Sequence, residues 1–182
     1  GGALGGMFVG LLAPLLFPAY FELPIGLFLC ALLATVVLWR GLRRHWRLLL
    51  LLALAGYGWR LGTVSKEFVD GYVVTARNFY SQLRVSERHD GGPGWKRVMV
   101  HGRINHGEQY LAEAHRRTPT SYYCHESGVG RALFELPQER PLKLGMIGLG
   151  TGTLAAYGRA GDELRIYEIN EQVLDLANSH FT

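Results

Sequence analysis

Three glycines at alternating positions form the stretch of this sequence with the clearest capacity for chemistry. They are Gly148, Gly150 and Gly152 in GMIGLGTGTLAAYG, residues 145–158. An apolar run precedes them, and a segment with helical character follows from about Thr153. Glycines at such a turn let the backbone bend sharply and approach a ligand, while a helix start presents free N–H groups to it. The pattern favours a turn that holds a nucleotide or nucleoside cofactor.

A carboxylate follows the turn at a spacing that suits a ribose. Glu168 lies 20 residues after Gly148, near the end of LRIYEIN (164–170), which we expect to be a strand. A carboxylate in that position can accept hydrogen bonds from both ribose hydroxyl groups, a contact that suits adenosine or a dinucleotide. A tight strand-to-helix turn without a ligand is the structural alternative, and the carboxylate in register disfavours it.

The glycine spacing leaves two classes of cofactor open. Gly150, Gly152 and Ala155 fit G-x-G-x-x-A, a tolerated dinucleotide fingerprint. Gly148, Gly150 and Gly152 also fit G-x-G-x-G, the pattern of enzymes that bind S-adenosylmethionine or its decarboxylated form. The glycines alone do not decide between these classes.

The elements around the turn predict a β-rich module followed by the start of a βαβ unit. Ser127 is expected to cap a short helix, because serine is a favoured residue at a helix N-terminus. The predicted strands cover residues 77–85, 95–100, 101–110, 142–148 and 164–170, and the predicted helices cover 127–135 and 171–181.

The first 61 residues have the composition of membrane segments. Apolar runs cover 1–18, 23–39 and 48–61, the last of which is short for a membrane span. Four arginines between the second and third runs predict a cytoplasmic loop rather than a nucleic-acid site. If the third run crosses the membrane, the soluble part lies on the far side, away from the cytoplasmic supply of nucleoside cofactors. Whether that run spans therefore stays open.

Three histidines in the β-rich module invite a metal interpretation. His101, His106 and His115 are spaced by segments that contain glycines, which disfavour the helix that an H-x-x-x-H metal site needs. We expect no metal, and we expect hairpin hydrogen bonding or substrate contact for the histidines. Arg116 and Arg117 are expected to form a solvated face.

The segments upstream of the glycine turn, taken with it, carry a family resemblance. RNFYSQLRV, VMVHGRINHGEQY, RRTPTSYYCHESGVG, IGLGTGTLAAYG and YEIN together resemble the spermidine-synthase-like aminopropyltransferases. The similarity covers residues 77–182 and is greatest to the bacterial branch in which this domain follows a multi-helix membrane region. The resemblance implies a small β module, then a Rossmann-like domain that binds decarboxylated S-adenosylmethionine.

The resemblance also implies roles for individual residues. By this resemblance the glycine turn would hold the cofactor and Glu168 its ribose, while an amide from Asn105 or Gln109 would contact the cofactor too. The residues expected to bind the cofactor are Gly148, Gly150, Thr151, Gly152, Glu168 and Gln109. The residues expected near the substrate are Tyr122, Tyr123 and His125, beside Glu126.

Three departures from the family bear on the chemistry. His101-Gly102 replaces the usual Asp-Gly, and Pro119 and Thr120 lie where an acidic pair normally precedes the tyrosine cluster. Aminopropyl transfer needs a neutral amine, so a group near the amine must take or relay its proton. The family's central catalytic acid follows a later strand, and we expect it beyond Thr182.

These features predict transmembrane helices, then a small β module, then the start of a Rossmann-like α/β domain. The chain begins Gly-Gly and ends soon after the second α/β strand, so we expect a fragment. The expected parts are membrane helices at 1–61, a linker at 62–76, a β-rich module at 77–126 and an incomplete cofactor domain at 127–182.

The expected activity is aminopropyl transfer from decarboxylated S-adenosylmethionine to a polyamine. The alternatives are an S-adenosylmethionine-dependent methyltransferase and a non-catalytic transport or sensing protein with a nucleoside- or polyamine-binding domain. The expected location is a bacterial plasma membrane, with several membrane passes and the catalytic domain in the cytoplasm. Membrane lipid and a small polyamine are the expected partners, nucleic acid is not, and a homodimer is left open.

Overall fold

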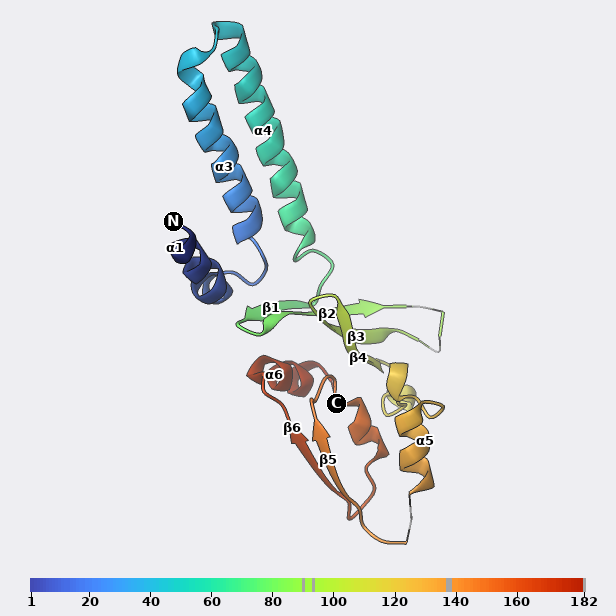
Figure 1. Ribbon diagram of the computed structural model, residues 1–182. Helices are drawn as coiled ribbons and strands as arrows, with labels where there is room; N and C mark the ends of the chain where they lie inside the picture. Colours follow the sequence, from blue (N-terminus) through green and yellow to red (C-terminus); the bar gives the residue numbers. More distant parts are fainter. Residues whose placement is uncertain (90, 93, 137–138, 182) are drawn as a thin grey trace. The chain divides into compact units, whose positions relative to one another are not determined.

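The computed structural model describes residues 1–89, 91–92, 94–136 and 139–181 (Figure 1). The chain divides into two compact units. Unit 1 comprises Gly1–Gly71 and Arg77–Phe79, and unit 2 comprises Tyr72–Ala76 and Tyr80–Thr182.

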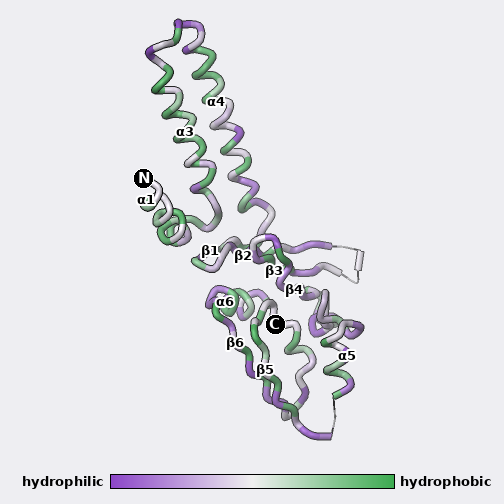
Figure 2. The backbone as a smooth tube through the Cα atoms, in the orientation of Figure 1, coloured by the Kyte–Doolittle hydropathy of each residue, from purple (hydrophilic) through white to green (hydrophobic). Residues whose placement is uncertain are grey.

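Unit 1 is helical and apolar along most of its length. Its elements are α1 (Gly2–Met7), a π-helical turn (Phe8–Leu12), α2 (Ala13–Leu16), α3 (Glu22–Leu38), a 3-10 turn (Trp39–Gly41) and α4 (Arg44–Glu67). Helices α3 and α4 pack side by side (Figure 1), and both are hydrophobic near their junction, while α4 becomes more polar toward its C-terminal end (Figure 2). Gly58 allows this approach, since a Cβ added there would lie 2.9 Å from the Phe28 ring.

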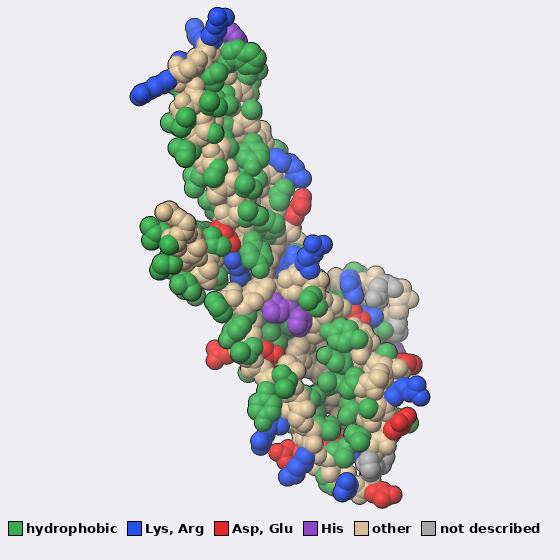
Figure 3. All heavy atoms as spheres, viewed as in Figure 1, with side chains coloured by type: hydrophobic (Ala, Val, Ile, Leu, Met, Phe, Trp, Pro, Cys, Tyr) green, Lys and Arg blue, Asp and Glu red, His purple; other side chains and the backbone are tan. Residues whose placement is uncertain are grey.

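Two helices of the described chain are long and apolar enough to cross a membrane: Glu22–Gly41 and Arg44–Glu67. Their apolar side chains are exposed, and basic side chains gather where α3 and α4 join (Figure 3). The first apolar run forms a shorter helical stretch, Gly2–Leu16. Of the three apolar runs, the second and third therefore lie in helices of spanning length, and the first does not.

Helix α4 corrects the expected boundary of the third run. The helix continues to Glu67, so residues 62–67 are not part of a linker. In its more polar last turns the hydroxyl groups of Thr63 and Ser65 donate to the carbonyls of Arg60 and Leu61, at 2.7 and 2.8 Å, so both side chains satisfy their polar groups within the helix.

A buried ion pair joins distant parts of the sequence within unit 1. The Arg77 guanidinium donates to both carboxylate oxygens of Glu22, at 2.7 and 2.8 Å, and to the carbonyl of Ala19 at 3.0 Å. The Arg77 and Glu22 side chains are only 5% and 7% exposed. Bidentate geometry and the extra carbonyl offset the cost of burying both charges.

The β-rich module is a four-stranded sheet in the order β1-β2-β3-β4. The strands are β1 (Val74–Asn78), β2 (Ser81–Arg88), β3 (Lys96–His101) and β4 (Ile104–Tyr110), with β2, β3 and β4 antiparallel. The expected strand at 77–85 is wrong in extent, because a turn at residues 79–80 separates β1 from β2. The expected strands at 95–100 and 101–110 are confirmed to within a few residues.

Two parallel strands follow this sheet. They are β5 (Lys143–Ile147) and β6 (Glu163–Tyr167), with α5 (Gly128–Glu135) before them and α6 (Glu171–His180) after them. The side chain of Ser127 accepts from the Gly130 N–H and caps α5, as predicted. The helix expected after the glycine turn is instead one 3-10 turn, η5 (Thr153–Tyr157).

The core of unit 2 joins the first sheet to the last helix. Leu83, Val85 and Met99 from β2 and β3 are fully buried, and they cluster with apolar side chains of the α6 region. Those side chains are Val173, Leu176 and Phe181. Burying each such side chain contributes roughly 1.5–3 kcal/mol, so α6 holds the parallel strands against the antiparallel sheet.

Candidate functional site

The glycine turn adopts a backbone that other residues rarely adopt. Gly148, Gly150 and Gly152 have φ angles of +89°, +56° and +76°. A side chain in this left-handed region costs roughly 1–2 kcal/mol, so glycine is the suitable residue at all three positions. The alternating glycines are therefore explained first by the path of the backbone.

Strand β4 lies directly against the turn and gives two glycines a packing role. A Cβ at Gly150 would overlap the carbonyl of His106, and a Cβ at Gly107 of β4 would overlap the side chain of Thr151. Within the described part of the chain, a Cβ at Gly148 would meet nothing within 4 Å. Of the glycines at positions 148 and 150, Gly148 is therefore the one with open space where a side chain would stand, a difference that spacing alone did not predict.

Glu168 fixes the turn through the backbone. Its two carboxylate oxygens accept hydrogen bonds from the N–H groups of Leu149 and Asn170, each at 2.9 Å. The half-buried carboxylate thereby ties the turn after β5 to the segment after β6. Each oxygen keeps a further lone pair, so the carboxylate retains the capacity to accept a ribose hydroxyl.

His106 lies near this carboxylate, and His101 lies beside His106. The rings of His101 and His106 are 4.9 Å apart between centroids. Burial lowers the pKa of His106, and the neighbouring His101 lowers it further, against the opposing charge of Glu168. Among the described residues, the Nε2 atom of His101 is buried without a hydrogen-bond partner.

The residues expected near the substrate form a separate contact group. The Tyr122 hydroxyl donates to the carbonyl of Asn105 at 2.8 Å, and the Tyr122 and Tyr123 rings lie 4.6 Å apart. Burial raises the pKa of Tyr122, and Tyr123 adds to that rise. His125 packs edge-on against Tyr157, whose hydroxyl donates to the Tyr123 carbonyl at 2.6 Å. This group connects the tyrosines to the segment after the glycine turn.

The two amides expected near the cofactor differ in their surroundings. The Oδ1 atom of Asn105 accepts from the N–H of Gly107 at 2.8 Å, a local turn that occupies this oxygen. Gln109 instead lines a cavity with Thr151 and Gly152. Of the two, Gln109 is thus the amide in the cavity that borders the turn.

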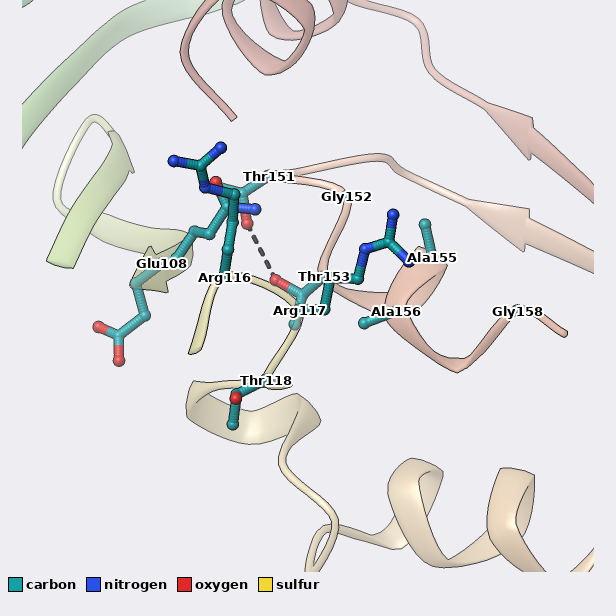
Figure 4. A pocket seen from close by; sticks show the side chains of 11 residues that line it. Glu108, Arg116, Arg117, Thr118, Thr151, Gly152, Thr153, Ala155, Ala156 and Gly158 are labelled. Carbon is teal, nitrogen blue, oxygen red and sulfur yellow. Dashed lines mark hydrogen bonds between the residues drawn. The ribbon is translucent and has the colours of Figure 1, made fainter. Parts of the chain in front are cut away.

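That cavity has a volume of about 290 Å³ and lies beside the turn (Figure 4). It is lined by Arg116, Arg117 and Thr118 on one side and by the turn and η5 on the other. The hydroxyls of Thr151 and Thr153 are hydrogen-bonded at 2.9 Å. Arg116 and Arg117 are exposed, as expected for a solvated face, but they also line a cavity, which was not expected. The sequence signal for this site was the adjacent pair of arginines just before Thr118.

The histidines suggested for a metal do not gather into one site in the described residues. No group of three or more His, Cys, Asp or Glu side chains there could hold a metal ion. The His115 ring packs against Tyr110 at 5.9 Å, and the Glu108 carboxylate pairs with Arg88 and Lys96. The site therefore offers hydrogen-bonding groups and charges to a ligand.

Comparison of the chain with family models, with curated proteins and with solved structures found no match in any of the three. The resemblance to spermidine-synthase-like aminopropyltransferases consequently stays a prediction.

We expect Gly150→Ala to destabilise unit 2 more than Gly148→Ala. Both variants place a side chain at a positive φ, but only the first adds a clash with the His106 carbonyl. Gly148→Ala should cost about 1–2 kcal/mol, and Gly150→Ala clearly more. The full chain in detergent is unfolded with urea, and the susceptibility of unit 2 to proteolysis at each urea concentration reports the loss of stability in each variant. Gly145→Ala is the control, and equal losses at positions 148 and 150 would contradict the packing role.

We expect unit 2 to lose stability as the pH falls below about 6.5, the ordinary histidine pKa. Folding lowers the pKa of His106, so the folded state binds fewer protons than the unfolded state, and stability is fully present above that pH. His106→Gln should flatten this slope, whereas His89→Gln should leave it. Unfolding midpoints measured from pH 7.5 to 5.0 test this, and an unchanged slope in His106→Gln would refute it.

Proposed function

We propose that unit 2 binds an adenosyl cofactor at the glycine turn and transfers part of that cofactor to an amine. The observation that carries this proposal is the turn with its carboxylate: left-handed glycines, an open side at Gly148, and Glu168 held beside Leu149. A carboxylate fixed beside an open turn suits the paired hydroxyls of a ribose. Gln109 and Thr151 in the adjoining cavity supply further polar contacts.

The specific reaction proposed is aminopropyl transfer from decarboxylated S-adenosylmethionine to a polyamine. The amine nitrogen forms a bond to the carbon next to the sulfonium, the C–S bond breaks, and methylthioadenosine leaves while the amine loses a proton. This version is supported by the resemblance of residues 77–182, and the Rossmann-like completion of the β5–β6 pair belongs to the same proposal.

A second candidate is methyl transfer from S-adenosylmethionine itself. Arg116 and Arg117 beside the turn favour it, because the intact cofactor carries a carboxylate that the decarboxylated form lacks. The two reactions share the adenosyl site and differ in the group that occupies the neighbouring cavity.

We further propose that α3 and α4 anchor this domain in a bacterial plasma membrane as a helical hairpin. Both helices have the length and composition for it, and the arginines at their junction favour a cytoplasmic loop there. A hairpin that crosses twice puts residues after 67 on the side opposite that loop, which conflicts with a cytoplasmic cofactor domain. Thiol labelling at Cys124 from each side of sealed vesicles distinguishes the two orientations.

The proposed ribose contact predicts that adenosine binds the full-length protein about tenfold or more tightly than 2′,3′-dideoxyadenosine. Hydrogen bonds to a charged group contribute roughly 1.5–3 kcal/mol, and the dideoxy compound lacks both donors. Calorimetric titration measures the preference. Glu168→Gln should reduce it, while Glu171→Gln, which changes a nearby exposed carboxylate, should not. Equal affinities in the wild-type protein would remove the ribose contact.

The reaction itself is tested by product release. Full-length protein given decarboxylated S-adenosylmethionine and putrescine should release methylthioadenosine, which chromatography quantifies. Gly150→Ala protein, prepared in the same way, controls for contaminating enzymes. S-adenosylhomocysteine formed from S-adenosylmethionine would replace the first candidate with the second. Cofactor binding without either product would leave a non-catalytic binding module.

A further inference from the structure

The cavity beside the glycine turn carries two positive charges that the described chain leaves unpaired. Arg116 and Arg117 line it, and neither guanidinium has an ion-pair partner among the described residues. The one hydrogen bond found for Arg116 is a long one, 3.4 Å, to the carbonyl of Leu111. Two adjacent arginines therefore border a hollow with free donor groups.

The one carboxylate among the described lining residues does not neutralise these charges. Both oxygens of Glu108 are engaged, one by Arg88 at 2.8 Å and the other by Lys96 at 2.9 Å. Figure 4 draws this carboxylate pointing away from Arg116 and Arg117. The cavity is consequently electropositive, although its wall includes an acidic residue.

The same arginines border a second, larger hollow. A cavity of about 680 Å³ shares Arg116, Arg117 and Thr118 with the first, and it also contacts His125. Among the described residues that line this cavity, Glu113 is the acid, and it is exposed, so two arginines there face one carboxylate. The arginines thus lie between the glycine turn and the region of the residues expected near the substrate.

Guanidinium groups in a hollow select ligands by charge. Arginine binds carboxylates and phosphates through paired, charge-assisted hydrogen bonds, and threonine hydroxyls such as those of Thr118 and Thr153 can add to them. A fully protonated polyamine would meet like charges in the same place. The lining therefore favours an anion in this cavity, and a polyamine acceptor of the proposed reaction would have to bind outside it.

We propose that the cavity of about 290 Å³ lined by Arg116 and Arg117 is an anion subsite that holds a carboxylate next to the adenosyl site. The carboxylate belongs either to the amino-acid end of S-adenosylmethionine or to an acceptor that bears both an amine and a carboxylate. This inference rests on the proposed function in one respect, the binding of an adenosyl compound at the turn. The electropositive lining itself does not depend on it.

The test uses the full-length protein in detergent and isothermal titration calorimetry. S-adenosylmethionine and its decarboxylated form are titrated first. Succinate and spermidine are then titrated, with and without saturating decarboxylated cofactor. The variant is Arg116→Gln with Arg117→Gln, and the control is Arg131→Gln with Arg140→Gln, which removes two exposed arginines outside both cavities. A third protein, Arg116→Lys with Arg117→Lys, keeps the charge.

Either of two results supports the anion subsite. In the first result, wild-type protein binds S-adenosylmethionine about tenfold or more tightly than the decarboxylated form, and only the glutamine variant loses this preference. The carboxylate then belongs to the cofactor. In the second result, the two cofactors bind with equal affinity, and succinate binding weakens about tenfold in the glutamine variant but is partly retained in the lysine variant. The carboxylate then belongs to the acceptor.

The proposal is overturned if succinate does not bind and no cofactor preference is seen, or if the glutamine variant binds as the control does. If either of these results is seen and spermidine binds the wild-type protein and the glutamine variant equally, the protein holds a cation site that does not depend on the two arginines. Failure of both adenosyl compounds to bind would count against the proposed function alone. Arginine-dependent succinate binding to the free protein would then still support the anion subsite.

Discussion

The close contact between β4 and the glycine turn is the constraint on which the candidate site depends. A missing side chain on each partner, at Gly107 and at Gly150, lets one backbone approach the other. That approach brings His106 toward Glu168 and puts Gln109 and Thr151 on the wall of one cavity. A side chain at either glycine would separate the antiparallel sheet from the turn, and with it the groups that each contributes.

Much of the local structure could be predicted because its causes are local. Ser127 caps α5 with its own side chain, and α6 has its buried residues at helical spacing. The helix expected after the turn failed for an equally local reason. Gly152 takes a left-handed conformation at its start and Gly158 ends it, and the five residues between them form a single 3-10 turn.

The site was less predictable than the elements, because its properties come from pairs of distant residues. Gly150 fitted a cofactor motif, but its nearest constraint is a carbonyl 44 residues earlier, at His106. The charges of Arg116 and Arg117 were visible in the sequence, whereas the engagement of Glu108 by Arg88 and Lys96 was not. Those two ion pairs neutralise the Glu108 carboxylate and so decide that the charge lining the cavity is positive. Periodicity carries no information on which charges remain unpaired after folding.

The two backbone hydrogen bonds of Glu168 have a consequence for how tightly a ribose could be held. The carboxylate is already immobilised by Leu149 and Asn170 before any ligand arrives. Ordering a free side chain on binding costs about 0.5–1.5 kcal/mol, and an acceptor held in advance avoids most of that cost. Association at this carboxylate would therefore require little rearrangement of the protein, and its enthalpy would reflect the new hydrogen bonds rather than a conformational change.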